Sequence, residues 1–200
     1  MARPRTLLEM AGVPAAAPQW SASVLVLIDV QREYTEGALP LAGGAEAVKE
    51  CARVLAAARA AQAPVFHVAH HGRPGGALFN PEGPLVQFAA DVAPRPGEAV
   101  VTKGLPNAFA GTALNDMIAA TGRKSLIVAG FATHMCVSAP VRAATDLGWR
   151  SAVVAGATAT RDLPDPLGGT VDAATVQRAA LAELADRFAT VVPNTDAIIP

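Results

Sequence analysis

Short apolar runs alternate with amphipathic segments along most of the chain. The first run, VLVLIDV at residues 24–30, is apolar at almost every position, which is typical of a strand buried on both faces of a parallel sheet. The predicted strands are residues 24–30, 64–70, 99–103, 125–131, 151–155 and 190–192, and the predicted helices are residues 45–61, 112–120, 136–147 and 171–187. This alternation predicts an α/β fold in which helices cover both faces of one parallel sheet.

Two stretches interrupt the alternation. Residues 1–22 have no clear period and contain Pro4, Pro14 and Pro18, so we predict an N-terminal arm with one short helix, followed by a single domain at residues 23–200. Residues 71–98 are rich in glycine and proline and predict a long excursion with one short helix near residues 85–90. Long loops inside compact domains are more often functional than accidental.

Composition and charge exclude several classes of protein. The 200 residues are 52% hydrophobic and 4% aromatic, with a net charge of −1, and no cluster of basic and aromatic residues indicates a nucleic-acid partner. No apolar run approaches the ~20 residues of a membrane span. Glu9, Gly12 and Pro14 interrupt the short apolar stretch near the N-terminus, which disfavours a signal peptide and favours the cytoplasm. Two distant cysteines, Cys51 and Cys136, argue against a disulfide framework.

Three titratable residues fall at the carboxyl ends of predicted strands, where ligands bind in open parallel sheets: Asp29, Lys103 and Cys136. Each has an ordinary alternative role, as a turn cap, a surface lysine or a small buried hydrophobe. Together they form a coherent nucleophilic site. A helix N-terminus and Lys103 would both stabilise a Cys136 thiolate, and Asp29 could carry the thiol proton to a leaving amine. Backbone amides in the turn before Cys136 could hold an oxyanion.

Three segments carry a resemblance to a known superfamily: VLIDVQREY at residues 26–34, VVTKGLPNAFAGTAL at residues 100–114 and GFATHMCVSAPVRAATDLGW at residues 130–149. Their sequences and spacing resemble the isochorismatase-like cysteine hydrolases, over about residues 23–192. This superfamily includes nicotinamidases, N-carbamoylsarcosine amidases, ureidoacrylate hydrolases and isochorismatases. The resemblance implies a three-layer Rossmann-like fold with a six-stranded parallel sheet, in which the first and fourth strands are neighbours.

The resemblance also implies a site and a chemistry. It implies a catalytic triad of Asp29, Lys103 and Cys136, a cis peptide between Phe131 and Ala132, and an oxyanion hole formed by the amides of Ala132 and Cys136. True isochorismatases hydrolyse a vinyl ether and several lack the cysteine, so Cys136 favours cleavage of an amide, ureide or carbamoyl C–N bond through a thioester. No cofactor is expected, and because relatives often form oligomers we expect a homo-oligomer.

Three histidines lie in or directly after the second predicted strand, in the region where nicotinamidases bind a metal. His67, His70 and His71 are present, but the Asp-x-His pair of nicotinamidases is missing. Neighbouring strand residues point to opposite faces, so one metal could not easily bind all three histidines. We therefore expect no metal and no nicotinamidase activity, and we expect one or two of these histidines to line the crevice.

Side chains near the triad in sequence are the candidates for contacting a small-molecule substrate: Gln31, Tyr34, Phe109, Phe131 and His134. The aromatic residues could equally be core, and His134 could be an ordinary turn residue. Gln31 would point with Asp29 if the strand continues that far. The loop at residues 71–98, with Arg73, Phe79 and Asn80, is expected to shape the pocket, and the substrate itself is not identified by the sequence.

Other classes of protein remain as alternatives to the hydrolase. A thiol-based redox protein would need a resolving cysteine, for which Cys51 in a predicted helix is the candidate. A non-catalytic small-molecule-binding homologue is disfavoured by the complete triad. A dinucleotide-binding enzyme is disfavoured because QREYTEGALP follows the first strand, without a Gly-x-Gly-x-x-Gly turn.

Overall fold

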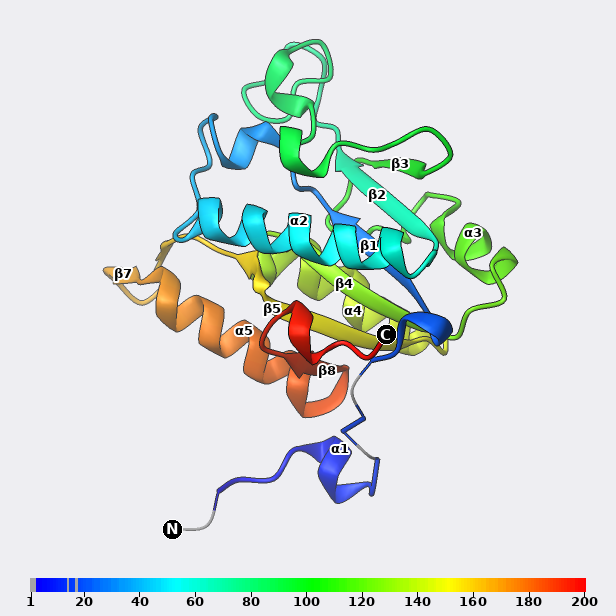
Figure 1. Ribbon diagram of the computed structural model, residues 1–200. Helices are drawn as coiled ribbons and strands as arrows, with labels where there is room; N and C mark the ends of the chain where they lie inside the picture. Colours follow the sequence, from blue (N-terminus) through cyan, green and yellow to red (C-terminus); the bar gives the residue numbers. More distant parts are fainter. Residues whose placement is uncertain (1–2, 14, 17) are drawn as a thin grey trace.

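The computed structural model describes residues 3–13, 15–16 and 18–200, and a six-stranded parallel sheet forms its centre (Figure 1). The order across the sheet is β3-β2-β1-β4-β5-β8, and each neighbouring pair is parallel. The strands are β1 (Ser23–Ile28), β2 (Val65–His70), β3 (Ala99–Lys103), β4 (Ser125–Phe131), β5 (Arg150–Ala159) and β8 (Ala189–Val192). The first and fourth strands are therefore neighbours, and the α/β fold expected from the sequence is confirmed.

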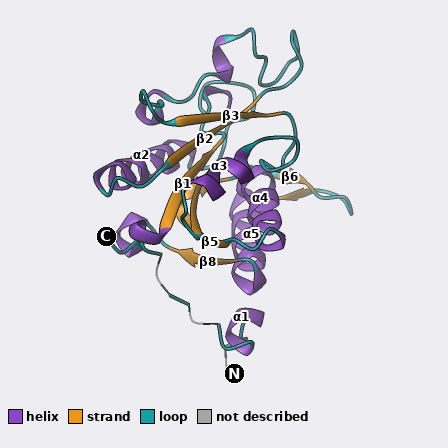
Figure 2. Ribbon diagram, turned by 90° about the vertical axis from the view of Figure 1, so that its right-hand side faces the viewer, coloured by secondary structure: helices purple, strands orange, loops and turns teal. Residues whose placement is uncertain are grey.

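Helices cover both faces of this sheet. They are α2 (Gly44–Ala60) on one face, and α3 (Leu114–Ala120), α4 (Ser138–Asp146) and α5 (Ala173–Arg187) on the other. Figure 2 shows α2 on one side of the strands and α4 and α5 on the opposite side. Along β1, Leu25 and Leu27 pack in the cluster under α2, whereas Val24 and Val26 pack in the cluster under the other helices. Burial on both faces explains why β1 is apolar throughout.

Two elements differ from their predicted bounds in ways that affect the site. The fifth strand continues to Ala159, beyond the predicted end at residue 155, because its second half consists of small residues without an apolar run. The fourth helix begins at Ser138 and not at Cys136, because Thr133–Val137 form a π-helical turn, η5. Such turns are frequent at functional sites.

The loops contain short elements of their own. The excursion at residues 71–98 holds two 3-10 turns, η3 (Pro84–Val86) and η4 (Ala90–Val92), in place of the single predicted helix. A small antiparallel hairpin, which the sequence did not predict, follows β5. The remaining elements are β6 (Leu163–Pro164) and β7 (Thr170–Val171) in that hairpin, and the turns η1 (Trp20–Ala22), η2 (Arg32–Tyr34) and η6 (Thr195–Ala197).

The N-terminal arm carries a short helix, α1 (Leu7–Met10), and lies outside the sheet in Figure 1. Two hydrogen bonds anchor the arm, one from the Leu7 amide to Asp186 Oδ1 (2.9 Å) and one from the Trp20 amide to the Ile199 carbonyl (3.1 Å). In the described part of the chain, no helix has both the length and the hydropathy to cross a bilayer. The division into an arm at residues 1–22 and a domain at residues 23–200 stays a prediction.

The strand order places a crevice between β1 and β4. The chain proceeds outward in opposite directions from these two strands, and ligands bind at the carboxyl ends of strands at such a point. Gly130 allows the two strands to approach closely there: its φ is +124°, and a Cβ atom would lie 1.9 Å from the Ile28 carbonyl oxygen. The residues that follow Ile28 and Phe131 are thereby brought face to face.

Candidate active site

The three residues predicted at the carboxyl edge meet in this crevice. Asp29 directly follows β1, Lys103 ends β3, and Cys136 lies in η5 after β4. The Lys103 ammonium donates a hydrogen bond to Asp29 Oδ2 at 2.7 Å, and both side chains are 0% exposed. A carboxylate oxygen of Asp29, Sγ of Cys136 and a ring nitrogen of His70 all lie within 4.8 Å of one another. The structure therefore brings the predicted nucleophile, acid and cation together, with His70 as a fourth member.

The backbone around the site has unusual conformations on both sides of the crevice. Asp29 has a φ of +50°, in the left-handed region that aspartate tolerates better than most residues. The peptide bond between Phe131 and Ala132 is cis. The Ala132 carbonyl then accepts hydrogen bonds from the amides of Met135 and Val137, which closes the turn that carries Cys136. The assignment of the Ala132 and Cys136 amides to an oxyanion hole stays a prediction.

Burial controls the protonation of Asp29. It raises the pKa of the carboxyl group to about 6, against the opposing effect of the Lys103 charge. Lys103 satisfies only Oδ2, and within the described residues no hydrogen bond reaches the buried Oδ1 apart from the weak one that the Cys136 thiol can offer. A carboxyl group in this state can both accept and donate a proton near neutral pH.

The Cys136 thiol is more difficult to ionise than its sequence position suggests. Burial, followed by the nearby Asp29 carboxylate, raises the pKa of the thiol to about 12, and the Lys103 charge opposes the increase. The resting group is therefore the thiol and not the thiolate expected for a cysteine at a helix start. The sulfur is buried, and it lies in the π-helical turn before α4. Its proton must leave as it attacks, and the free oxygen of Asp29 is the adjacent acceptor.

The three histidines of the second strand have separate roles. His70 ends β2, with Nδ1 3.1 Å from Lys103 Nζ. Burial, and then the charge of Lys103, lowers the pKa of His70 to about 4, so its neutral ring accepts a hydrogen bond from the ammonium through Nδ1. His67 has its Nε2 2.9 Å from Glu98 Oε2, and the His71 amide donates to the Lys103 carbonyl. Only His70 reaches the triad, as expected for alternating strand residues.

The arrangement fits an ammonium group better than a metal ion. Asp29, His70 and Cys136 offer one ligand atom each, which is a possible metal-binding set. However, the Lys103 ammonium already bonds to Asp29 Oδ2 and lies against His70 Nδ1. A cation held by these three residues would have to displace a buried lysine, so the donor set provides no independent metal site.

Comparisons with known proteins agree with the fold. The isochorismatase domain family matches residues 23–196, which include all members of the cluster around Lys103. The protein belongs to the isochorismatase family. A crystal structure of an isochorismatase from Pseudomonas putida is 41% identical, with a TM-score of 0.93, and the match covers 98% of this chain and 100% of that one.

Two curated relatives illustrate the range of this family. The "Secreted isochorismatase effector Isc1" of Verticillium dahliae is 38% identical over 187 residues, or 94% of this chain and 96% of that protein. The "Maleamate amidohydrolase" of Pseudomonas putida is 33% identical over 146 residues, or 65% of this chain and 68% of that protein. The two names differ, so the geometry of the site must indicate the reaction.

Aromatic side chains form one wall beside Cys136 in this isochorismatase-family protein. The ring of Tyr34 packs edge-on against Phe79 (5.2 Å between centroids) and Phe131 (5.9 Å), and Phe79 also packs against His70 (5.0 Å). Burial raises the pKa of Tyr34, so its hydroxyl group is a neutral donor. Phe131 is fully buried behind Tyr34. The loop at residues 71–98 thus contributes Phe79 to this wall, and its role in shaping a substrate pocket stays a prediction.

Two buried polar residues hold this loop in place. Glu33 accepts hydrogen bonds from the amides of Phe79 (3.1 Å) and Ala38 (2.9 Å). The Gln31 amide group bonds to the backbone N–H and carbonyl of His70 and to the Val86 carbonyl. Gln31 therefore ties β2 to the loop, although the sequence placed it among the substrate contacts. The strand ends at Ile28, so the alternation that would have aimed Gln31 with Asp29 does not continue.

Phe109 and His134, the other predicted contacts, lie in different surroundings. Phe109 packs against the core cluster under α3 and α4, beside Ile28 and Leu114, which is the core role that the sequence left open. His134 has its Nδ1 within hydrogen-bond distance of the Thr160 hydroxyl group. Its Nε2 is buried and has no partner in the described part of the chain, so it is available to a bound molecule.

Arg161 is a residue of the site that the sequence did not single out. It lies two residues beyond β5, half-buried, and its guanidinium donates to the Asp162 carbonyl. No carboxylate of the described residues pairs with it. Burial and the nearby charges of Cys136 and Asp29 raise the pKa of Tyr34, and the Arg161 charge opposes this rise. Burial, followed by the Arg161 charge, lowers the pKa of His134. Ligands bind at the carboxyl ends of parallel strands. If the small residues up to Ala159 had been assigned to the fifth strand, Arg161 would have been a candidate on this ground.

Proposed function

We propose that the protein is a cysteine amidohydrolase, which cleaves an amide, ureide or carbamoyl C–N bond of a small molecule without a cofactor. One observation carries this proposal: the buried Cys136 thiol faces a carboxyl group whose other oxygen is held by Lys103. A pKa of about 6 for Asp29 suits a group that must take a proton from sulfur and return it to nitrogen.

The proposed reaction has two halves. Cys136 Sγ attacks the substrate carbonyl carbon while its proton moves to Asp29, and the amides of Ala132 and Cys136 bind the resulting oxyanion. The C–N bond then breaks as Asp29 protonates the leaving nitrogen, which leaves a thioester on Cys136. A water molecule, losing its proton to Asp29, attacks the thioester carbonyl. The C–S bond breaks, the acid is released, and Asp29 returns the proton to sulfur.

We further propose that the substrate carries a carboxylate. Arg161 provides a cation beside Tyr34 and His134 that no described carboxylate neutralises. A planar guanidinium group binds a carboxylate through two parallel hydrogen bonds. The name of the maleamate amidohydrolase relative gives an amide of this type, in which a carboxylate lies a few bonds from the scissile C–N bond.

Hydrolysis of a vinyl ether is the second candidate, because two of the similar proteins are described as isochorismatases. Such a reaction would not need Cys136. A redox function is disfavoured, because Cys51 packs in the cluster on the opposite face of the sheet and donates to the Ala157 carbonyl at 3.2 Å. Burial also raises the pKa of the Cys51 thiol.

A screen of ammonia release tests the proposal. Small amides, ureides and carbamoyl compounds are assayed with the unmodified protein, with Cys136→Ala and with Cys51→Ala, which removes the other cysteine. We expect release that Cys136→Ala abolishes and Cys51→Ala retains, together with a thioester adduct on Cys136 detected by mass spectrometry. Release that is unchanged in Cys136→Ala, or hydrolysis of isochorismate by both variants, would defeat the mechanism.

The cytoplasmic location and the homo-oligomer stay predictions from the sequence. One of the similar proteins is described as secreted, which makes the location worth testing. Cell fractionation with the native N-terminus tests the first prediction, and light scattering of the purified chain tests the second.

A further inference from the structure

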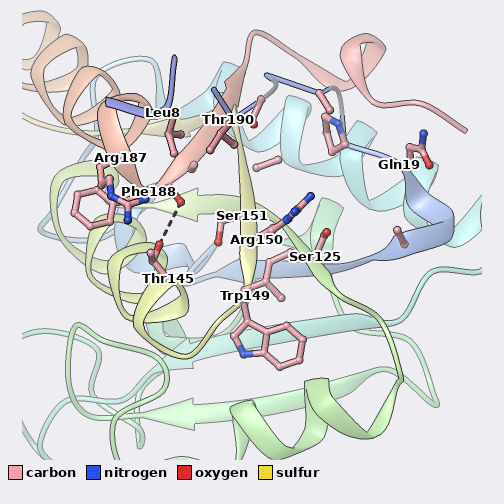
Figure 3. A pocket seen from close by; sticks show the side chains of 17 residues that line it. Leu8, Gln19, Ser125, Thr145, Trp149, Arg150, Ser151, Arg187, Phe188 and Thr190 are labelled. Carbon is pink, nitrogen blue, oxygen red and sulfur yellow. Dashed lines mark hydrogen bonds between the residues drawn. The ribbon is translucent and has the colours of Figure 1, made fainter. Parts of the chain in front are cut away.

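A cavity lies at the opposite edge of the sheet from Cys136. It has a volume of about 420 Å³, and its floor is formed by the amino ends of β4, β5 and β8 (Figure 3). Because β4 has seven residues, this floor is about 20 Å from the candidate active site. The volume falls within the range of about 300–1,000 Å³ that is usual for small-ligand pockets.

The N-terminal arm forms the roof of this cavity. The arm is fixed at one end by the hydrogen bond from Leu7 to Asp186 and at the other by backbone pairing of residues 18–20 with Ile199. Between these points Leu8 and Val13 line the cavity. The aromatic rings of Trp149 and Phe188 line it as well, so that much of its interior is apolar.

Ser151 supplies a polar group at the floor that has no partner. Its residue is 7% exposed, it lines the cavity, and its Oγ atom makes no hydrogen bond to any described residue. Buried hydroxyl groups nearly always have a partner. A ligand in the cavity could therefore form a hydrogen bond with this hydroxyl group. Figure 3 shows Ser151 between Arg187 and Arg150.

Two arginines give the cavity a positive charge. Arg150 and Arg187 both line it, neither forms an ion pair with a described residue, and no aspartate or glutamate is among the described lining residues. The Asp186 carboxylate nearby is bonded to the Leu7 amide. Arg187 lies in the last turn of α5, where a cation complements the helix dipole, so its presence has a structural explanation. Arg150 is an exposed residue at the start of β5.

We propose that this cavity binds a small amphipathic carboxylate, with the acid group at Arg150, Arg187 and Ser151 and the apolar body between Trp149, Phe188 and the arm. The site is separate from the candidate active site and does not depend on the proposed reaction. An apolar interior with a few convergent polar groups is the usual form of a ligand pocket, and the two cations select for an anion.

Calorimetric titration with octanoate, 1-octanol and octylammonium tests the proposal on the full chain. These probes share the apolar body and differ in charge. We expect octanoate to bind at least about tenfold more tightly than octylammonium. The Arg150→Gln/Arg187→Gln variant should lose about tenfold or more in octanoate affinity with little change for octanol, and Ser151→Ala should lose several-fold. Each single arginine variant is measured too, in case the double variant does not fold.

Two controls locate the binding. Arg95→Gln/Arg178→Gln removes two exposed arginines outside the cavity and should leave octanoate binding unchanged. Arg161→Gln, which changes the candidate active site, should also bind octanoate normally. Equal affinity for octanoate and octylammonium, loss of binding in Arg161→Gln, or unchanged binding in the double variant would each overturn the proposal. A further result would also overturn it: the chain binds no octanoate and forms a dimer, and Leu8→Asp dissociates this dimer. The cavity would then be a contact surface between two copies of the chain.

Discussion

A buried ionic cluster and a part-buried one lie on opposite faces of β2, and they differ in the number of hydrogen-bond donors around the carboxylate. The active-site cluster is Asp29, Lys103 and His70, and the structural cluster is Glu98, Arg59 and His67. Each contains a histidine from β2, and because His67 and His70 are three residues apart, they point to opposite faces. The same strand thus contributes a histidine to a cluster of one carboxylate and one cation on each of its faces.

The carboxylates of the two clusters are in opposite electrostatic states. Glu98 accepts hydrogen bonds from the Arg59 side chain at 2.7 and 2.9 Å, from the Arg95 amide at 2.8 Å and from His67, and its pKa falls to about 2, with the Arg59 hydrogen bond as the largest cause. Asp29 receives a strong hydrogen bond only from Lys103, so burial prevails and its pKa rises to about 6. The carboxyl group that exchanges protons receives few hydrogen bonds, whereas the carboxylate that stabilises the fold receives several.

The largest effect is expected when the proton carrier of the active-site cluster is replaced. Asp29→Asn keeps the shape and can adopt the left-handed backbone, but an amide cannot accept the thiol proton. The turnover of an amide substrate should fall about a hundredfold to ten-thousandfold. Steady-state ammonia release measures this loss, and circular dichroism checks that the variant is folded. A folded Asp29→Asn variant with full activity would remove Asp29 from the mechanism.

The next effect concerns Arg161, which has no carboxylate partner among the residues that the structure describes. Arg161→Gln should lower kcat/KM about tenfold to a hundredfold for an amide that carries a carboxylate, because it removes a charge-assisted hydrogen bond. Succinamic acid and butyramide form a matched pair, since they differ only in the terminal carboxylate. The variant should treat butyramide as the unmodified protein does. An equal loss for both amides would mean that Arg161 maintains the structure of the site and does not recognise the acid.

The two clusters should change the stability of the protein in opposite directions as the pH rises. Asp29 must be ionised to accept the thiol proton, so kcat/KM should fall about tenfold per pH unit below pH 6. Because the folded pKa of Asp29 is raised above its ordinary value of 3.8, the protonated carboxyl group contributes to stability, fully below about pH 3.8, and this contribution is lost as the pH rises through about 6. Glu98 has a depressed folded pKa, so its contribution is present above its ordinary pKa of 4.5 and is lost as the pH falls toward 2.

Both windows can be measured on one protein. Initial rates between pH 4.5 and 8 give the first, and urea unfolding between pH 2 and 7 gives the second. A rate that shows no fall around pH 6 would contradict the assignment of the proton carrier to Asp29.

The meeting of Asp29, Lys103 and Cys136 could be predicted from the sequence because parallel sheets collect the carboxyl ends of their strands at one edge. The apolar runs that locate those ends are long in β1 and β4 and short in β3, where AVVTK still ends at Lys103. The adjacency of β1 and β4, which brings Asp29 opposite Cys136, was available only through the family resemblance, since strand order is not written in any local pattern.

The remaining features of the site depend on packing. The contact between His70 and Lys103, the thiol form of Cys136 and the role of Gln31 each follow from burial and from the point at which a strand stops. Arg161 was missed because the end of β5 consists of small residues, whose pattern resembles a loop. Local sequence therefore located the reacting groups, whereas their protonation and the contacts that support them needed the three-dimensional structure.

The smallest effect on catalysis is expected in the structural cluster, and it provides the control for the comparison. Glu98→Gln keeps the size of the side chain but leaves Arg59 and His67 without their charged partner, so the free energy of unfolding at pH 7 should fall by about 1–3 kcal/mol. The activity at 25 °C should stay within about twofold, because the change lies on the other face of β2 from Asp29. Urea unfolding and ammonia release on the same sample measure both quantities. If Glu98→Gln instead lowered the rate as strongly as Asp29→Asn, the two clusters would be coupled through β2, and the separation of a reacting acid from a structural one would fail.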